Sequence, residues 1–262
     1  MLSLDQIKNF FPEYLRNQPA HQKYIVKEYL LLMILDYLST SSYAAKLSFI
    51  GGTNLRLIKG IDRFSEDIDF DCKDFSKADF MKMTDDILVF LQRNGMGVET
   101  RDKENNNLKG FRRNFYFPSF LFDLGLSGHK DERFLIKTEV QDQLIPYETK
   151  MTVVKGCGFL FPFPVPPDEI LCAMKLSALL SRKKGRDFYD TLFLLSHTKP
   201  NYTFLSRKHN IHNLTELKSA LQAMLKTVNL RQKSKDFEHL LFDKKRSEKV
   251  RQFDQLIFEA LL

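Results

Sequence analysis

Four prolines within seven residues divide this chain into two parts with different sequence patterns. The segment Phe161-Pro-Phe-Pro-Val-Pro-Pro167 fixes φ at each proline and lacks four backbone donors, so it can be neither a helix nor a central strand. Before it, alternating and helical patterns are mixed; after it, nearly all the chain has helical spacing. We therefore predict an α+β domain over residues 1–165 and a helical domain over 166–262, with a cleft between them as a natural ligand site.

The first part predicts a mixed, mostly antiparallel sheet with flanking helices. Asp67-Ile-Asp-Phe-Asp71 alternates strictly, which is typical of a strand with one buried face. Strands are expected over residues 47–50, 67–71, 98–102, 111–117, 120–126 and 134–141, and helices over 22–46, 53–59 and 74–94. In the second part, helices are expected over 168–182, 187–197, 213–228, 234–241 and 246–261.

The positive charge of the chain is concentrated in its last third. The formal net charge is +7, and residues 168–262 hold 18 Lys and Arg against 11 Asp and Glu, a difference that equals the whole excess. A basic region of this kind attracts polyanions such as RNA or nucleotides. Solvated faces of lysine-rich helices are the alternative interpretation.

The sequence favours a protein that is not bound to a membrane. Its longest apolar run, Tyr29–Leu35, ends at Asp36 and is too short to span a bilayer, and the N-terminus has no secretory pattern. Three cysteines (Cys72, Cys157 and Cys172) form no closely spaced pair. We therefore expect a reduced, cytoplasmic setting.

A glycine pair follows the short strand expected at residues 47–50. Gly51 and Gly52 remove side chains where the backbone must turn and could approach a ligand closely. The helix that follows would offer N–H groups to a phosphate, and the Thr53 hydroxyl could donate to a phosphate oxygen or cap the helix. Taken alone, such a turn is more often a plain connection from strand to helix.

Two aspartates on the next predicted strand favour the ligand interpretation. Asp67 and Asp69 are two residues apart, so their side chains share one face, while Ile68 and Phe70 point to the core. Carboxylates so close repel each other, and Mg²⁺, which prefers oxygen ligands, relieves that repulsion. We predict that Asp67 and Asp69 are metal ligands. The alternative is an acidic, solvent-facing strand edge, to which Asp71 would also belong.

A site with two metal ions usually takes a third carboxylate from a neighbouring strand. Glu139 is our candidate, because the alternation of Phe134–Val140 places Lys137 and Glu139 on the side away from the core. Such a carboxylate could also accept a proton from an attacking hydroxyl. Asp123, in the strand expected at residues 120–126, is the alternative.

A second group of charged residues follows the proline segment, in two consecutive predicted helices. Its members are Lys175 and Arg182, on one face of the first helix, and Arg186, Asp187 and Asp190, at the start of the next. Acidic residues at a helix start are favoured by the helix dipole, which is a purely structural interpretation. In the functional interpretation, Lys175 binds nucleotide phosphates, and Asp187 and Asp190 orient the basic side chains.

These blocks together resemble the AbiEii family, the nucleotidyltransferase toxins of bacterial toxin–antitoxin systems that are close to the MenT toxins. The resemblance covers roughly residues 20–200 and rests on four blocks in the expected order. They are Gly51-Gly52-Thr53-x-Leu55-Arg56, Arg63-Phe64-Ser65-x-Asp67-x-Asp69-Phe70, Lys175-x-x-Ala178-x-x-x-Arg182 and Arg186-Asp187-x-x-Asp190.

The resemblance implies a fold and a set of site residues. The expected fold is a DNA polymerase β-like nucleotidyltransferase domain followed by a helical domain. Metal binding is implied for Asp67 and Asp69; Glu139, which matches the family pattern less closely, would be a third ligand. These three residues, Lys175 and Asp187 would be catalytic. The nucleotide-binding positions would be Gly51, Gly52, Thr53, Arg56, Ser65, Lys175, Arg182, Arg186 and Asp190.

The function implied by the resemblance is a toxin of an AbiE-like, phage-resistance system. It would use two Mg²⁺ ions to transfer a nucleoside monophosphate from an NTP to an acceptor hydroxyl, which in some members of the family is the 3′ end of tRNA. An antitoxin encoded nearby would be its partner. A nucleotide- or RNA-binding module without transferase activity, and a transferase acting on a small molecule, are the two alternatives.

Overall fold

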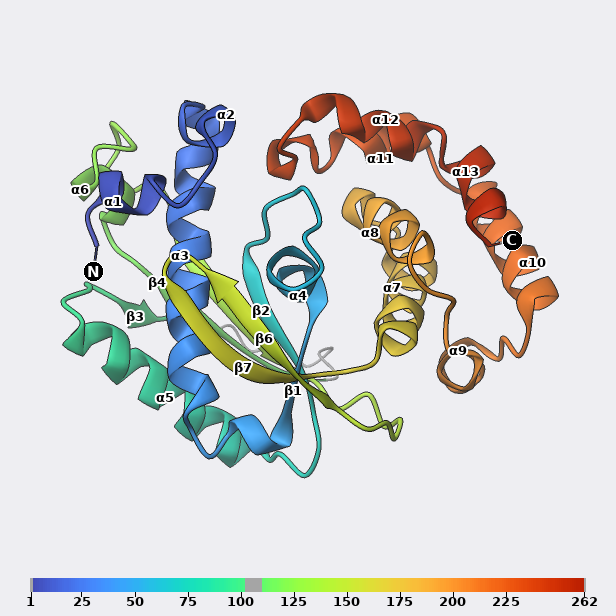
Figure 1. Cartoon of the computed structure of the whole chain (residues 1–262), viewed down its shortest axis with the longest axis horizontal. Coiled ribbons are helices and arrows are strands. Elements are labelled where there is room, and N and C mark those ends of the chain that lie inside the picture. The colour runs from blue at the N-terminus through green and yellow to red at the C-terminus, as the bar shows by residue number, and fades with distance from the viewer. Residues whose placement is uncertain (1, 102–109, 262) are drawn as a thin grey trace. The chain divides into compact units, whose positions relative to one another are not determined.

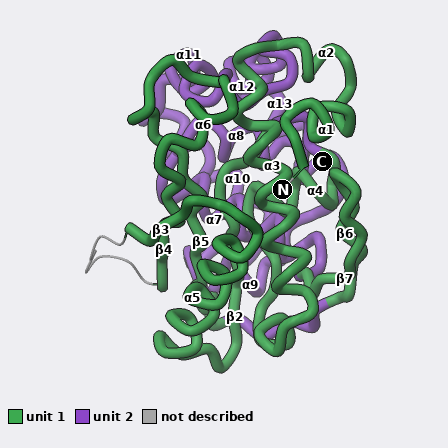
Figure 2. The backbone as a smooth tube through the Cα atoms, turned by 90° about the vertical axis from the view of Figure 1, so that its left-hand side faces the viewer, with its two compact units in different colours: residues 1–60, 64–144, 150–165 green, residues 61–63, 145–149, 166–262 purple. Residues whose placement is uncertain are grey.

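The chain forms two compact units (Figure 2) in a computed structural model that describes residues 2–101 and 110–261. Unit 1 comprises residues 1–60, 64–144 and 150–165, and unit 2 comprises 61–63, 145–149 and 166–262. Two short segments, 61–63 and 145–149, thus belong to unit 2 although their sequence neighbours belong to unit 1.

Unit 1 is built on a five-stranded sheet with the order β1-β2-β5-β4-β3 (Figure 1). The strands are β1 (Leu47–Ile50), β2 (Asp67–Cys72), β3 (Glu99–Thr100), β4 (Phe111–Tyr116) and β5 (Leu135–Val140). Only the pair of β2 and β5 is parallel among the pairs described for this sheet. The mixed, mostly antiparallel sheet is confirmed. The strand expected at 98–102 is shorter, and Asp102 lies outside the described residues.

Unit 1 also contains helices, two of which contact these strands. They are α1 (Leu4–Lys8), α2 (Glu13–Arg16), α3 (Pro19–Ser39), η1 (Ala44–Lys46), α4 (Gly51–Leu57), α5 (Lys77–Arg93) and α6 (Phe120–Asp123). Helix α4 contacts β1 and β2, and α5 contacts β4 and α3. The helix expected at 22–46 is α3, which begins three residues earlier, with Pro19 in its first turn, and ends at Ser39.

The strand expected at 120–126 is wrong, because residues Phe120–Asp123 form helix α6. The chain has a positive φ on both sides of this helix, 54° at Ser119 and 68° at Gly125, so no extended run can form there. A short apolar run does not by itself distinguish a strand from a helix, and this one was misread for that reason.

A two-stranded antiparallel sheet, which the sequence did not predict, completes unit 1. It pairs β6 (Lys150–Gly156) with β7 (Phe159–Val165), and Pro162 lies opposite Val153. Each strand of a two-stranded sheet has an edge without ladder bonds, so a residue lacking an N–H is tolerated there. The proline segment is therefore compatible with a strand, although not with a central one.

Phenylalanine fills the core behind β2. The ring of Phe70 lies 6.0 Å from that of Phe49 on β1 and 5.6 Å from that of Phe163 on β7, measured between centroids. All three side chains are at most 1% exposed. This packing fixes one face of β2 in the core, so the alternate residues of the strand lie on the opposite face.

Unit 2 is helical in its described residues. Its elements are α7 (Asp168–Arg182), α8 (Gly185–Leu195), α9 (Tyr202–His209), α10 (Leu214–Leu225), α11 (Leu230–Lys235), η2 (Glu238–Leu240), η3 (Lys244–Ser247), α12 (Glu248–Arg251) and α13 (Phe253–Ala260). Helix α7 packs on α8, α9 and α10, while α8 also contacts α11, α12 and α13. Helix α9 was not predicted, and the helix expected at 234–241 is not formed as such, because α11 ends at Lys235 and only η2 follows. No helix in the described ranges is long and apolar enough to cross a membrane.

Candidate active site

The turn between β1 and α4 is shaped by a glycine that no other residue could replace without strain. Gly51 has a φ of 81°, which side chains of L-residues disfavour. A Cβ atom built at this position would lie 2.2 Å from Oδ2 of Asp69, well inside the contact limit. The absence of a side chain at Gly51 therefore allows the Asp69 carboxylate to lie directly against the turn.

Two buried polar side chains tie the start of α4 to the neighbouring strands. The Thr53 hydroxyl donates to the backbone carbonyl of Asp67, and the Asn54 amide donates to the carbonyl of Phe49 at 2.7 Å. Helix α4 has no side-chain cap at Ile50, so Thr53 does not cap it. The hydroxyl instead holds the first residue of β2 next to the glycine turn.

Asp67, Asp69 and Glu139 lie on one face of the sheet, and we call these three residues the acidic face. Asp69 is paired in register with Glu139 across the parallel β2–β5 ladder. The alternation predicted for both strands is confirmed, because Ile68, Phe70 and the alternate residues of β5 are buried. Carboxylates from two strands therefore come together, as expected for a metal-binding face.

Asp71 does not belong with a solvent-facing strand edge. It is 4% exposed, and its Oδ1 accepts hydrogen bonds from the backbone N–H groups of Cys72 and Gln143, both at 2.8 Å. The carboxylate thus holds the chain that leaves β5. Its role is structural. Asp71 therefore does not support the alternative interpretation of β2 as a solvent-facing acidic edge.

Two cations lie against the acidic face. Nζ of Lys137, on β5, is 2.7 Å from Oδ2 of Asp67 and 3.4 Å from Oε1 of Glu139. Arg112, on β4, donates to Glu139 from its Nε at 2.7 Å. Burial lowers the pKa of Lys137, but the Asp67 carboxylate, followed by Glu139 and Asp69, outweighs burial and raises that pKa above its ordinary value. The lysine is therefore firmly charged.

The donor set of the acidic face fits a magnesium ion that also binds a nucleotide. In the part of the chain that the structure describes, no three His, Cys, Asp or Glu side chains are placed to hold an ion on their own. Magnesium in nucleotide enzymes, however, takes one or two carboxylates and completes its shell with phosphates and water. Asp67 and Asp69 supply the carboxylates, and the Asp69 carboxylate lies directly against the glycine turn.

Glu139 and its sequence alternative occupy very different places. Glu139 is the direct cross-strand neighbour of Asp69, whereas Asp123 is the last residue of helix α6 and lies outside the sheet. The geometry therefore favours Glu139 as the third carboxylate.

Two other predicted site residues of unit 1 lie at least partly within the fold. Arg56 donates from Nε and one terminal nitrogen to both carboxylate oxygens of Glu28, at 2.8 and 2.9 Å. Ser65 is 5% exposed. Glu28, on α3, was not singled out in the sequence, because its partner lies 28 residues away.

Unit 2 holds a buried cluster centred on Asp190, formed with Arg63 and Lys175, which we call the Asp190 cluster. Arg63 donates twice to the Asp190 carboxylate, both at 2.7 Å, and Lys175 donates to Oδ2 at 2.8 Å. Burial acts to raise the pKa of Asp190, but the charges of Arg63 and Lys175 outweigh it and hold that pKa well below its usual range. Asp190 therefore stays ionised.

Arg63 was missed as a functional candidate although it lies in a quoted motif block. It is 0% exposed, and residues 61–63 belong to unit 2 by their contacts. A fully buried arginine that is held by two bonds to one carboxylate fixes the backbone around it.

Asp187 contacts both the start of α8 and the side chain of Arg182. Its carboxylate accepts from the backbone N–H of Lys184, at 3.1 Å, which stabilises the start of α8. It also accepts two bonds from Arg182, at 2.9 and 2.7 Å. Arg186 is half-buried and forms no ion pair with another described residue.

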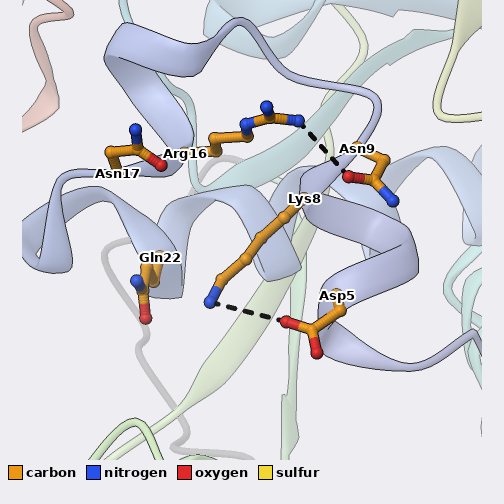
Figure 3. A pocket seen from close by; sticks show the side chains of 6 residues that line it. All are labelled: Asp5, Lys8, Asn9, Arg16, Asn17 and Gln22. Carbon is orange, nitrogen blue, oxygen red and sulfur yellow. Dashed lines mark hydrogen bonds and ion pairs between the residues drawn. The ribbon is translucent and has the colours of Figure 1, made fainter.

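A separate open depression lies on the N-terminal helices (Figure 3). It encloses about 550 Å³ and is lined by Asp5, Lys8, Asn9, Arg16, Asn17 and Gln22. Its two cations are engaged locally, Lys8 with Asp5 at 4.0 Å and Arg16 with Asn9 at 3.3 Å. None of these residues belongs to the motifs above, so the depression is not part of the candidate site.

The chain is similar to one known protein family and to solved structures. The family described as "Nucleotidyl transferase AbiEii toxin, Type IV TA system" matches residues 33–261. JHP933 of Helicobacter pylori has a similar structure, with a TM-score of 0.52 and 21% identity over 91% of this chain and 93% of that one. A comparison with curated proteins found no match.

A second solved structure is also similar. The nucleotidyltransferase toxin MenT4 of Mycobacterium tuberculosis has a TM-score of 0.53 and 15% identity over 100% of this chain and 98% of that one. At these identities the two structures bear on the fold alone, and they confirm the nucleotidyltransferase fold predicted for the chain.

Proposed function

Because this chain belongs to the AbiEii family of nucleotidyltransferase toxins, we propose that it transfers a nucleoside monophosphate from an NTP to an acceptor hydroxyl with the help of Mg²⁺. As a family member it is a nucleotidyltransferase and the toxin of a toxin–antitoxin pair, with an NTP as substrate and an antitoxin as partner. The observation that carries the magnesium proposal is the acidic face, whose Asp69 carboxylate lies directly against Gly51.

The residues of the acidic face have separate roles in this proposal. Asp67 and Asp69 would hold the metal ions, with Glu139 as a third ligand, and Glu139 would accept the proton of the acceptor hydroxyl. When bound, Mg²⁺ neutralises the charge that builds on the phosphate oxygens. The acceptor oxygen attacks the α-phosphorus while the bond to the pyrophosphate oxygen breaks. The turn at Gly51, Gly52 and Thr53 gives the phosphates close access to the backbone.

The Asp190 cluster supports a phosphate-binding role for Lys175. In it, Asp190 holds the ammonium of Lys175 at 2.8 Å and also accepts from the guanidinium of Arg63. Arg182 and Arg186 would add positive charge, with Asp187 orienting Arg182, and Asp190 orienting Lys175. Arg56 and Ser65 remain proposed nucleotide contacts, and the contact of Arg56 with Glu28 would fix its orientation.

An RNA acceptor, with the 3′ end of tRNA as our specific candidate, agrees with the charge of unit 2. Residues 168–262 hold the whole positive excess of the chain, and polyanions bind such regions through their phosphates. NTPs and tRNA are both cytoplasmic in bacteria, which is where we place the reaction.

The proposal is tested by labelling. The purified protein is incubated with each of four α-labelled NTPs, Mg²⁺ and total RNA, and the label is followed to RNA, small molecules or neither. We expect one NTP to label an RNA of tRNA size. Asp69→Asn should reduce transfer by about 100-fold or more, because its carboxylate would hold the metal ion that neutralises charge in the transition state. It should also abolish growth arrest on expression.

The matched control is Asp131→Asn, an exposed aspartate of the same unit, which should transfer label at the wild-type rate. Label on a small molecule would contradict the RNA acceptor and leave the transferase in place. Full transfer by Asp69→Asn would contradict the metal assignment.

A further inference from the structure

Lys137 is a cation that contacts both ends of the acidic face. Its ammonium bridges Asp67 and Glu139, at 2.7 and 3.4 Å, while its side chain is 25% exposed. It comes from the same strand as Glu139 and is paired in register with Asp67. The charges that a metal ion would neutralise are therefore already partly neutralised by the chain itself.

An ammonium and a magnesium ion compete for the same oxygen atoms. Magnesium binds carboxylate oxygens at about 2.0–2.1 Å and demands a strict octahedral arrangement. A lysine that donates to Oδ2 of Asp67 occupies one of the few directions from which an ion could approach that carboxylate. Two positive charges on one carboxylate repel each other, so the ion must displace Lys137 or bind weakly.

The displaced ammonium has an obvious anionic partner in the proposed reaction. A triphosphate brought to the acidic face carries negative charge to within reach of a flexible lysine side chain. The ammonium of Lys137 could therefore move from the Asp67 carboxylate to a phosphate oxygen. Its positive charge would then remain paired in this partly buried place. Metal and nucleotide would then bind together far more readily than the metal alone.

We propose that Lys137 is a positioning residue of the nucleotidyltransferase site: its ammonium compensates Asp67 and Glu139 in the ligand-free protein and passes to the triphosphate when the metal binds. The inference rests on the proposed function of the acidic face. In this arrangement the metal ion binds well only together with the nucleotide. Until the nucleotide binds, the ammonium of Lys137 balances the negative charge of the carboxylates.

The test uses the full-length protein and the variant Lys137→Gln, which keeps an N–H donor but removes the charge. Binding of Mn²⁺ alone is followed by the electron paramagnetic resonance of the free ion, and binding of inorganic triphosphate in excess Mg²⁺ by calorimetry. We expect Lys137→Gln to bind Mn²⁺ alone about tenfold more tightly and triphosphate about tenfold more weakly than the wild type. General damage to the site would instead weaken both.

Two further variants control the comparison. Lys137→Arg keeps the charge and should stay close to the wild type in both measurements. Lys46→Gln removes another lysine of unit 1, one that pairs with Asp79 at 3.9 Å, and should change neither affinity. Unchanged or weaker binding of Mn²⁺ by Lys137→Gln would overturn the counter-ion role, and unchanged binding of triphosphate would overturn the transfer to phosphate.

The outcome is separable from that of the proposed function. Suppose that the wild type binds Mn²⁺, that Asp67→Asn abolishes this binding, and that label is transferred. In that case, unchanged affinities in Lys137→Gln contradict only the inference. If no variant binds Mn²⁺ and no label is transferred, the proposed function itself fails. Should Lys137→Gln unfold without metal, Mn²⁺ should restore its melting transition, and failure to do so would contradict the inference.

Discussion

Charged side chains gather in a different way in each unit. On the acidic face, carboxylates of Asp67 and Glu139 are held by the cations Lys137 and Arg112. In the Asp190 cluster, one carboxylate accepts hydrogen bonds from the two cations Arg63 and Lys175. Carboxylates are the side chains that a metal ion needs, and cations are those that a phosphate needs.

The Asp190 cluster predicts a pH-dependent stability. Its carboxyl pKa is held below the ordinary value, so the stability it contributes is fully present above about pH 4 and is lost as the pH falls through the folded-state value. Removing the charge in Asp190→Asn leaves Arg63 and Lys175 buried without compensation, which should cost about 3–5 kcal/mol of unfolding free energy at pH 7. Urea unfolding between pH 3 and pH 7 measures both effects.

The difference between the wild type and Asp190→Asn should be constant from about pH 5 to pH 7 and should shrink below about pH 4. Asp254→Asn, a change of an exposed aspartate in the same unit, should lower stability by no more than about 1 kcal/mol. A difference that grows as the pH falls would contradict the ionised state assigned to Asp190.

Lys137 and Arg63, like Glu28, were not singled out as functional candidates, and their partners lie far along the chain. Lys137 meets Asp67 across 70 residues, and Arg63 meets Asp190 across 127. Alternation correctly gave the face on which Lys137 lies, but it cannot give strand pairing, and only the parallel β2–β5 register brings Lys137 to Asp67. Asp67 and Asp69, by contrast, were predictable because their relation is local.

At the scale of elements, the turn from β1 into α4 shows how a connection becomes part of a site. Gly51 combines a φ of 81° with a close approach to Asp69, whereas Gly60, after α4, has a φ of 73° and nothing within 4 Å of a built Cβ. A comparison of substitutions at Gly51 and Gly60 therefore distinguishes the effect of backbone strain from the effect of a clash with the Asp69 carboxylate.

We expect Gly60→Ala to lose about 1–2 kcal/mol of stability through strain alone and to keep its transferase activity. Gly51→Ala should lose more stability and most of its nucleotide transfer, because the new Cβ must push the Asp69 carboxylate from its place. Thermal unfolding and the labelling assay measure the two effects. Equal activity in the two variants would show that the position of Asp69 is not critical.

Elements were predictable where a pattern was long or strictly alternating. Strand β1 and helix α7 have the bounds expected of them, and β2 ends one residue later. Helix α6 was misread because four apolar or acidic residues carry no clear period. The hairpin of β6 and β7 was missed because prolines argue against a strand, and only pairing at a sheet edge makes them acceptable.

For the molecule as a whole, the uneven charge predicts how an RNA substrate binds. The affinity for RNA should fall as salt rises, with a logarithmic slope of about −0.7 for each phosphate contacted in a single strand. The double variant Lys244→Gln/Lys245→Gln removes two exposed cations of η3 in unit 2. It should weaken RNA binding and flatten the salt dependence, while triphosphate binding stays unchanged, as measured by fluorescence anisotropy and calorimetry.

The matched control removes the same charge from unit 1, with Lys77→Gln/Lys82→Gln on the exposed side of α5. This variant should bind RNA with nearly the wild-type salt slope. Equal effects of the two double variants would mean that total charge, and not its location in residues 168–262, governs RNA binding.

The parallel pairing of β2 with β5 has a consequence for the cell that makes this toxin. Residues 73–134 separate the two strands, so a ribosome must synthesise far beyond the aspartates before Glu139 can join them. Pairing across so long an interval is among the slower steps of folding. Unfinished or prematurely terminated polypeptides therefore carry the aspartates without the glutamate, and we expect them to be harmless to the host during translation.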